Sequence, residues 1–238
     1  MMIKKCRLLF LAMLCTSLSA RSQEHWFHLY QDSTKLVKDA SAIISRIDAA
    51  IQQMDTSIRL QPNQVIKNTT PYLIYIDLQK RTVNLPLWAE VIPPQKEFFV
   101  DVAGGATEAE EVFGLFFNGF YLVHEYGHAF GENLGRKNDN AYDDEYDANQ
   151  FAIAYWKFIH REKELERCYQ WAKKMLIKLK NPVPPGEDRK QYLTAHYDAL
   201  SADPYQYGYI QFTQFVEIYE NEQTPGFLPL IQQYKKGK

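Results

Sequence analysis

Apolar side chains recur every three or four residues along most of this chain, which is the spacing of amphipathic helices. This spacing predicts a long helix over residues 33–56 and a second over the apolar stretch that leads from about 107 to 135. A third helical stretch spans about Tyr142 to Lys180 and ends at a proline-rich segment. Shorter helices are expected over 187–238, so helices dominate the second half of the chain.

The second of these helices has start and stop signals of its own. Gly104-Gly105 breaks the chain before it, and Thr107-Glu108-Ala109-Glu110 has the form of a capping box, in which the first and last side chains bond free backbone N–H groups. Gly131 and Gly135 are expected to end the helix. A polar loop over 136–144 should then connect it to the third helix.

Extended segments are predicted only in the first half of the chain. Tyr72–Ile76 is rich in β-branched and aromatic residues, and Thr82–Val91 and Phe98–Val102 look like two more strands separated by Pro93-Pro94. Pro86 makes the middle segment either an edge strand or an extended rim of the sheet. Such an edge could add a substrate strand beside a cleft, or it could be structural with no ligand.

Together these elements predict one α+β domain over residues 23–238. A small, mainly antiparallel sheet would lie in the part 23–103 and pack on the helix that starts near 107. The helices of 107–180 would follow, and then a helical C-terminal part over 187–238. The length suits a single domain with a substantial core.

The N-terminus has the three parts of a secretory signal peptide. Basic residues precede an apolar run at Leu8–Leu14, and small residues follow at Thr16–Ala20. Cleavage is expected after Ser22, giving a signal peptide of residues 1–22, with cleavage after Ala20 as the rival. A lipoprotein anchored at Cys15 is the less favoured alternative. We therefore expect an exported protein, periplasmic or secreted, with no stable membrane span after removal of the signal.

Charge and cysteine content narrow the function classes. Residues 1–22 hold four basic and no acidic side chains, so the remaining chain has 23 basic against 29 acidic residues and a formal charge of −6. This balance gives no support to nucleic-acid binding. Cys168 would be the one cysteine left, so it cannot form an internal disulfide. A passive, partly buried thiol is the favoured interpretation of Cys168, ahead of a nucleophile.

The strongest chemical signal lies in the second predicted helix. His124-Glu125-Tyr126-Gly127-His128 places two imidazoles four residues apart, on one helix face, where both can bind the same metal ion. Glu125 beside them can act on a water at that metal. This is the H-E-x-x-H pattern of zinc peptidases. The alternative is an amphipathic helix with two incidental histidines.

A catalytic zinc needs three protein ligands and an open position for water. The metzincin pattern would place a third histidine where Leu134 stands, so that route is closed. Glu145 in the next helix is the favoured third ligand, because Ala148 and Ala152 would let that helix approach the motif closely. The nearby acids are alternatives: Asp147 projects about 200° around the helix from Glu145. The other two, Asp143 and Asp144, are expected to form a solvated helix N-terminus.

His124-Glu125-x-x-His128, followed seventeen residues later by a helical Glu145, resembles the gluzincin clan of zinc metallopeptidases. It is most similar to a group of uncharacterised exported bacterial metallopeptidases of that clan. The resemblance covers about residues 107–155 and implies a zincin-like fold, with His124, His128 and Glu145 as Zn²⁺ ligands and Glu125 as general base. Many gluzincins have an aspartate that bonds a ligand histidine at the position held here by Asn149. If the Asn149 amide bonds the ring N–H of His124 or His128, it would raise the basicity of that ligand less than a carboxylate would.

Hydrolysis of a peptide bond also needs a donor for the developing oxyanion besides the metal. Four C-terminal side chains are candidates, and we favour the first and third as catalytic residues: His196, Tyr205, Tyr207 and Tyr209. The sequence thus predicts an exported zinc-dependent peptidase that acts on a peptide or protein substrate. The alternatives are a catalytically inactive metal-binding protein and a peptide-binding protein on the same fold.

Overall fold

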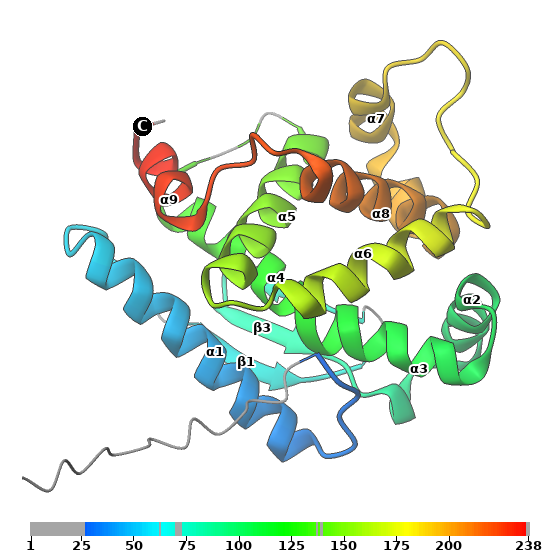
Figure 1. Ribbon diagram of the computed structural model, residues 1–238, viewed down its shortest axis with the longest axis horizontal. Coiled ribbons are helices and arrows are strands. Elements are labelled where there is room, and N and C mark those ends of the chain that lie inside the picture. The colour runs from blue at the N-terminus through cyan, green and yellow to red at the C-terminus, as the bar shows by residue number, and fades with distance from the viewer. Residues whose placement is uncertain (1–26, 62, 70–72, 137, 139, 237–238) are drawn as a thin grey trace, which may run out of the picture.

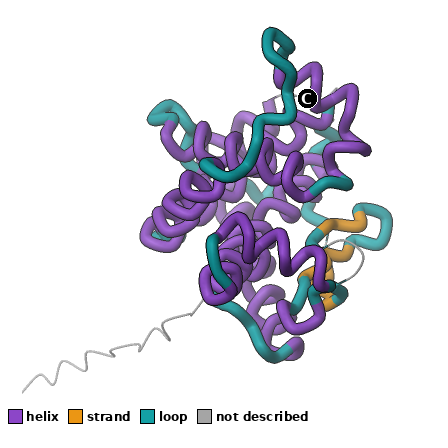
Figure 2. The backbone as a smooth tube through the Cα atoms, turned by 90° about the vertical axis from the view of Figure 1, so that its right-hand side faces the viewer, coloured by secondary structure: helices purple, strands orange, loops and turns teal. Residues whose placement is uncertain are grey.

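Helices account for most of the chain in the computed structural model, and all strands among the described residues lie within 64–85 (Figures 1 and 2). The structure describes residues 27–61, 63–69, 73–136, 138 and 140–236, so the expected signal peptide lies outside the described residues. The elements, in chain order, are α1 (Ser33–Met54), β1 (Gln64–Lys67), β2 (Tyr75–Asp77), β3 (Thr82–Leu85), a 3-10 turn (Trp88–Glu90), α2 (Pro93–Ala103), α3 (Ala106–Leu115), a π-helical turn (Phe116–Phe120), α4 (Tyr121–Asn133), α5 (Ala141–Phe158), α6 (Glu162–Leu176), α7 (Arg189–Ser201), α8 (Pro204–Glu220) and α9 (Phe227–Lys236).

α1 confirms the long N-terminal helix that the apolar spacing predicts. The side chain of Asp32 accepts a hydrogen bond from the backbone N–H of Lys35 and so caps its start. Its buried face includes Leu36, Ile47 and Ile51, which join the main core. Complete burial of one such side chain contributes roughly 1.5–3 kcal/mol, so this face holds α1 against the body of the protein.

The sheet is small and mixed, and the expectation of a mainly antiparallel sheet is corrected. Its strand order is β1-β3-β2, in which β1 pairs parallel with β3 and β2 pairs antiparallel with β3. β3 is therefore the central strand and ends at Leu85, so the edge-strand prediction for Thr82–Val91 is wrong. Pro86 follows the strand, where its missing N–H costs no ladder bond. β1 and β2 are the edge strands, and β2 keeps only the end of the predicted segment Tyr72–Ile76.

The predicted strand Phe98–Val102 is wrong, because these residues belong to α2. Two prolines occupy the first turn of this helix, where their missing N–H groups have no intrahelical partner in any case. The buried side chains fall at helical spacing, and Gly104 ends the helix at φ 95°, a conformation that favours glycine. The aromatic pair Phe98-Phe99 favours a strand, but the two prolines before it indicate the start of a helix.

α3, the π-helical turn and α4 form one continuous helical path from Ala106 to Asn133. The predicted capping box is wrong: the helix begins one residue before Thr107, its N-cap is Gly105, and that residue has no side chain to cap with. Gly131 lies inside α4, whereas Gly135 follows its end at φ 69°. The helix thus ends at the second of the two predicted glycines.

The single helix expected over 142–180 is two helices, α5 and α6. They separate at His160, which has a positive φ of 60°. α5 packs closely along α4, and a Cβ added to Gly127 of α4 would lie 3.2 Å from the Cα of Ala148 on α5. This close approach agrees with the expectation drawn from the small residue at 148.

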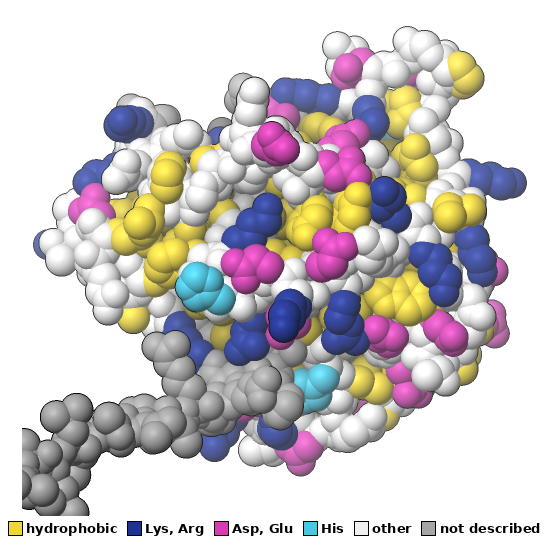
Figure 3. Space-filling model, viewed as in Figure 1, with side chains coloured by type: hydrophobic (Ala, Val, Ile, Leu, Met, Phe, Trp, Pro, Cys, Tyr) yellow, Lys and Arg dark blue, Asp and Glu magenta, His cyan; other side chains and the backbone are white. Residues whose placement is uncertain are grey.

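The C-terminal part is helical, as predicted. α8 packs on α5 and α6, while α7 is held by a separate small apolar cluster that includes Leu193, Leu200 and Ile210. Basic and acidic side chains intermingle over the face seen in Figure 3. Within the described ranges, no helix combines the length and apolar character that a membrane crossing requires.

Candidate metal centre

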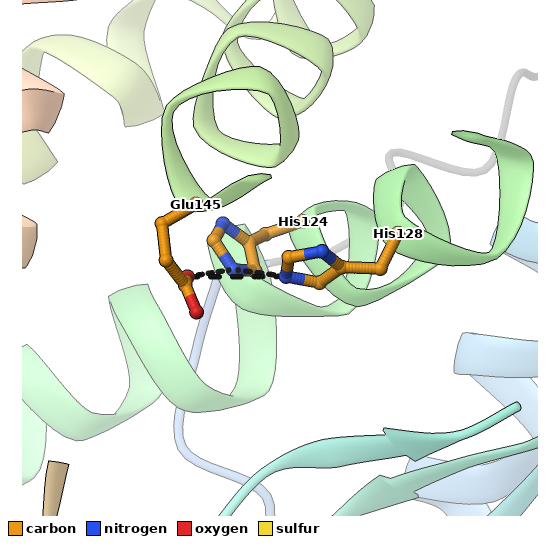
Figure 4. A group of neighbouring side chains, drawn as sticks. All are labelled: His124, His128 and Glu145. Atoms are coloured by element: carbon orange, nitrogen blue, oxygen red, sulfur yellow. Dashed lines mark hydrogen bonds and ion pairs between the residues drawn. The ribbon is translucent and has the colours of Figure 1, made fainter. Parts of the chain in front are cut away.

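Three side chains from two helices converge where α4 meets α5. His124 and His128 come from α4 and Glu145 from the first turns of α5 (Figure 4). The Nε2 atoms of the two histidines lie 3.2 Å apart, and Glu145 Oε2 lies 3.2 Å from the Nε2 of His124 and 3.8 Å from that of His128. His124 and Glu145 are buried, and His128 is nearly so.

These spacings fit a single metal ion. With bonds of about 2.0–2.1 Å and tetrahedral angles, two ligand atoms on zinc lie roughly 3.3 Å apart. The described residues contain this one group of His, Cys, Asp and Glu side chains that could hold a metal ion. The structure therefore brings together the three ligands that the sequence predicts, as a site that could bind a metal.

The partners of the two Nδ1 atoms explain why the two Nε2 atoms can act as metal ligands. Nδ1 of His124 lies 2.9 Å from Oδ1 of Asn149, and Nδ1 of His128 lies 3.2 Å from Oδ2 of Asp144. Both partners accept hydrogen bonds, so each Nδ1 carries a proton, and in the neutral form of each imidazole the lone pair is on Nε2. Asn149 thus lies where the resemblance places it.

Asp144 is a site residue that the sequence analysis missed. Its backbone does lie in the first turn of α5, as expected, but its half-exposed carboxylate reaches back to His128. The other two acids lie elsewhere, since Asp143 pairs with Lys190 and Asp147 with Arg136. The spacing from Asp144 to Glu145 could not reveal this contact, because it depends on the angle between α4 and α5.

Charge is concentrated at this junction. Burial alone would raise the pKa of Glu145, but the neighbouring imidazoles of His124 and His128 hold it well below its usual range. Burial would lower the pKa of His128, yet the hydrogen bond to Asp144 and the charges of Glu145 and Glu125 raise it to about 9. In the absence of a metal ion, a proton on His128 therefore offsets part of the carboxylate charge.

Glu125 stands between the histidines in sequence and faces the edge strand. Burial raises the pKa of its carboxyl group, although the histidines and a hydrogen bond from the backbone of Ile76 on β2 oppose this rise. A carboxyl group whose pKa is raised toward neutrality can both take and return a proton. The position and environment of Glu125 therefore suit acid–base chemistry.

The junction forms the floor of a cavity of about 1400 Å³. Ile74 to Ile76 of the β2 segment line one side, and residues of α7, among them Tyr197, line another. Tyr207 of α8 also lines it. The cavity is large enough to take several residues of an extended chain beside the three candidate ligands.

His196, predicted as a catalytic residue, is not among the residues that line this cavity. It lies on the exposed side of α7, with Nδ1 2.9 Å from the carbonyl oxygen of Tyr192 and its ring stacked on Tyr192. Tyr205 is also exposed and packs edge-on against Phe98. Helix α7 changes direction at His196, so sequence spacing alone could not assign its cavity face.

Tyr197 and Tyr207 are the tyrosines that reach the centre. The hydroxyl of Tyr197 donates to Oε1 of Glu145 at 3.0 Å, and the hydroxyl of Tyr207 accepts a hydrogen bond from Nε2 of Gln211 at 2.9 Å. Burial and the charge of Glu145 raise the pKa of both phenols, so both stay protonated. Tyr207 was predicted as a site residue, whereas Tyr197, one position beyond His196, was not.

Searches against protein-family models, curated proteins and solved structures found no match to this chain.

Proposed function

We propose that this protein is an exported, zinc-dependent peptidase. The observation that carries the proposal is the convergence of two lone-pair nitrogens and one carboxylate oxygen at the floor of a cavity, with Glu125 buried beside them. A structural zinc site normally closes its fourth position with protein and needs no base. The presence of three ligands, a base and an open cavity favours catalysis.

Two nitrogens and one oxygen favour zinc among the divalent metals of an exported protein. When bound, zinc would polarise a substrate carbonyl and lower the pKa of water toward 7. The side chains that would hold it are His124, His128 and Glu145. Asn149 and Asp144 would keep the two imidazoles in the tautomer that this role requires.

Glu125 would carry the proton transfers. Its carboxylate takes a proton from the attacking water and later delivers it to the leaving amine, so the peptide bond breaks with one water consumed. A buried carboxyl group with a raised pKa suits both steps. Tyr207 has a protonated hydroxyl in the cavity, which can donate to the oxyanion that forms on the carbonyl oxygen.

The substrate main chain would lie along β2. This strand is an edge of the sheet, pairs with β3 on one side only, and lines the cavity. An extended peptide could add to its outer edge by main-chain hydrogen bonds, with the Ile76 N–H exchanging its bond to Glu125 for one to the substrate. The edge expected at Thr82–Val91 is thus replaced by one at β2, next to the candidate ligands.

Metal content tests the first part of the proposal. Purified protein comprising residues 23–238 should contain about one zinc per chain by mass spectrometry. His128→Ala and Glu145→Ala should both lose it, while His160→Ala, which alters an exposed histidine outside the cavity, should keep it. Retention of zinc in Glu145→Ala would move the third ligand elsewhere.

Turnover of a peptide library tests the second part. The wild-type protein should cleave, and Glu125→Gln should keep its zinc but lose cleavage by a factor of at least about 100. Glu162→Gln, which neutralises an exposed carboxylate far from the cavity, is the matched control and should cleave normally. Zinc-loaded wild-type protein without any cleavage would contradict the peptidase proposal.

A further inference from the structure

A ring of polar contacts joins two of the candidate metal ligands through two amide side chains, and three of its four contacts are hydrogen bonds. Nε2 of Gln211 donates to Oε2 of Glu145 at 2.8 Å, and Oε1 of Gln211 accepts from Nδ2 of Asn149 at 3.1 Å. Asn149 Oδ1 then faces Nδ1 of His124 at 2.9 Å, and the two candidate ligand atoms, Nε2 of His124 and Oε2 of Glu145, lie 3.2 Å apart. All four side chains are buried.

The polarity of this ring has one solution. An ionised Glu145 only accepts hydrogen bonds, so Gln211 must present its NH₂ group to Glu145 and its oxygen to Asn149. Asn149 must then present its NH₂ group to Gln211 and its oxygen to His124. His124 is consequently protonated on Nδ1, which leaves the Nε2 lone pair for the metal.

A second amide fixes the same orientation independently. Nδ2 of Asn149 also donates to Oε1 of Gln214 at 3.1 Å, and Nε2 of Gln214 donates to the carbonyl oxygen of Tyr142 at 3.0 Å. Reversing the Asn149 amide would therefore bring its oxygen against two amide oxygens in a buried site. An unpaired buried acceptor costs about 1–3 kcal/mol, so this orientation is strongly held.

From this geometry we infer that Gln211 is a positioning residue that sets the His124 tautomer from the far side of Glu145. The inference rests on the metal site of the proposed function, although its first consequence concerns the metal-free protein. α8 contributes none of the three candidate ligands. Through Gln211 and Gln214 it nevertheless fixes which nitrogen of His124 is available.

The ring also gives a reason for the amide at position 149. An aspartate there would accept from His124 but would set a second carboxylate oxygen against Oε1 of Gln211 and Oε1 of Gln214. To relieve this contact, Gln211 would have to turn its oxygen toward Glu145. A carboxylate partner generally strengthens metal binding by histidine, and in this ring we expect the opposite.

Two measurements on three variants test the role of Gln211. Zinc affinity is measured by competition with a chromophoric chelator, and the His124 tautomer by long-range ¹H–¹⁵N correlation spectra of the metal-free protein. Gln211→Leu and Asn149→Asp should each weaken zinc binding about 10–100-fold. Gln211→Leu should also turn the single Nδ1–H tautomer of His124 into a mixture. Gln52→Leu, which removes an amide that donates to the backbone carbonyl of Ile58 and lies outside the ring, should change neither.

The outcomes that would overturn the inference are specific. They are zinc affinity within about twofold of wild type in a folded Gln211→Leu protein, an unchanged tautomer in that protein, or tighter zinc binding by Asn149→Asp. Thermal unfolding of each variant establishes that it is folded. The tautomer spectrum requires no metal, so it still tests Gln211 if the wild-type protein binds no zinc and the proposed function fails.

Discussion

The two histidines of the metal centre differ in the group that accepts a hydrogen bond from Nδ1. His124 contacts the neutral amide of Asn149, which is completely buried, whereas His128 contacts the carboxylate of Asp144 at the protein surface. A carboxylate partner makes an imidazole a better electron donor to a metal than an amide does. The lower ligand basicity that Asn149 is expected to give His124 is therefore offset by Asp144 at His128.

Asp144→Asn should weaken zinc binding about tenfold, because it removes the charge from the partner of Nδ1 of His128. Chelator competition measures the effect. Asp143→Asn is the matched control. Asp143 also lies in the first turn of α5, but its carboxylate pairs with Lys190 of α7 and does not reach either histidine. Equal zinc affinities for both variants would exclude a role for Asp144 in the centre.

Substitutions of Tyr207 and Tyr197, which both line the cavity, should have different effects. Tyr207→Phe should lower kcat about 100-fold at unchanged zinc content, because it removes a donor to the oxyanion. Tyr197→Phe should mainly weaken zinc binding, because its hydroxyl bonds the ligand Glu145. Steady-state kinetics and metal analysis of both proteins measure this split. A normal kcat for Tyr207→Phe would remove it from the catalytic step.

At the residue scale, the sequence predicts those site residues whose positions follow from local spacing. His124 and His128 lie four apart, so their common face follows from helix geometry alone. Asp144, Tyr197 and Gln211 reach the centre only because α4, α5, α7 and α8 cross at particular angles. Those angles follow from packing of the whole core, which no local pattern encodes.

At the scale of elements, the approach of α4 to α5 is the feature that makes the centre possible. Gly127→Ala would place a Cβ 3.2 Å from both the Cα of Ala148 and the Cβ of Phe151, so the helices must separate. We expect a loss of about 1–3 kcal/mol of unfolding free energy, measured by urea titration, together with weaker zinc binding.

Gly131→Ala is the control for that variant, since it lies one turn further along α4 and a Cβ there meets no atom within 4 Å. Replacing a helical glycine by alanine without a clash should stabilise the protein by roughly 0.5–1 kcal/mol. Similar unfolding free energies for the two alanine variants would show that close packing at Gly127 is not limiting.

α1 and α4 are joined by a polar contact that should respond to pH. The hydroxyl of Tyr126 donates to the carboxylate of Asp48, and burial raises the pKa of Asp48 against the opposing effects of that bond and of Arg81. The folded protein therefore holds this proton more tightly than the unfolded chain. The contribution of Asp48 to stability is largest below its unfolded pKa of about 3.9 and falls as pH rises through its folded pKa.

Asp48→Asn should remove that dependence. The unfolding free energy of the wild-type protein, measured by urea titration at a series of pH values from about 4 to 7, should decline relative to the variant as pH rises. A rise of the wild-type unfolding free energy relative to the variant with increasing pH would mean that hydrogen bonding outweighs burial at Asp48.

Helices and strands differed in how far the sequence could predict them. α1 and the region of α3 and α4 follow from apolar spacing repeated over several turns. The strands are only three or four residues long, which is too short to establish a period, and β1 was missed entirely. Pairing within a sheet depends on partners distant in sequence, so the central position of β3 could not be deduced from Pro86.

At the scale of the whole molecule, the candidate centre joins elements from both halves of the chain. Its floor is α4 and α5, and its sides come from the β2 segment and α7. Zinc that binds only the folded protein at a free concentration of 100 times its dissociation constant stabilises it by about 2.7 kcal/mol. For a domain of this size, that corresponds to a rise in Tm of roughly 5–10 °C.

This linkage can be measured by calorimetry with and without a chelator. The wild-type protein should lose several degrees in Tm on zinc removal, whereas Glu145→Ala should have the same Tm in both conditions. A wild-type Tm that does not respond to zinc would mean that the folded chain does not bind it preferentially.

The π-helical turn Phe116–Phe120 has a consequence for the direction in which the histidines point. Each such turn holds about one residue more than an α-helical turn, so everything after it is rotated by about 100° relative to a regular helix. The aromatic side chains before the turn and the imidazoles after it are thus out of phase. A change of 116–120 to regular α-helix at unchanged length would swing the imidazoles about a quarter-turn away from Glu145, whereas deleting one residue there would remove the π-turn and keep their direction.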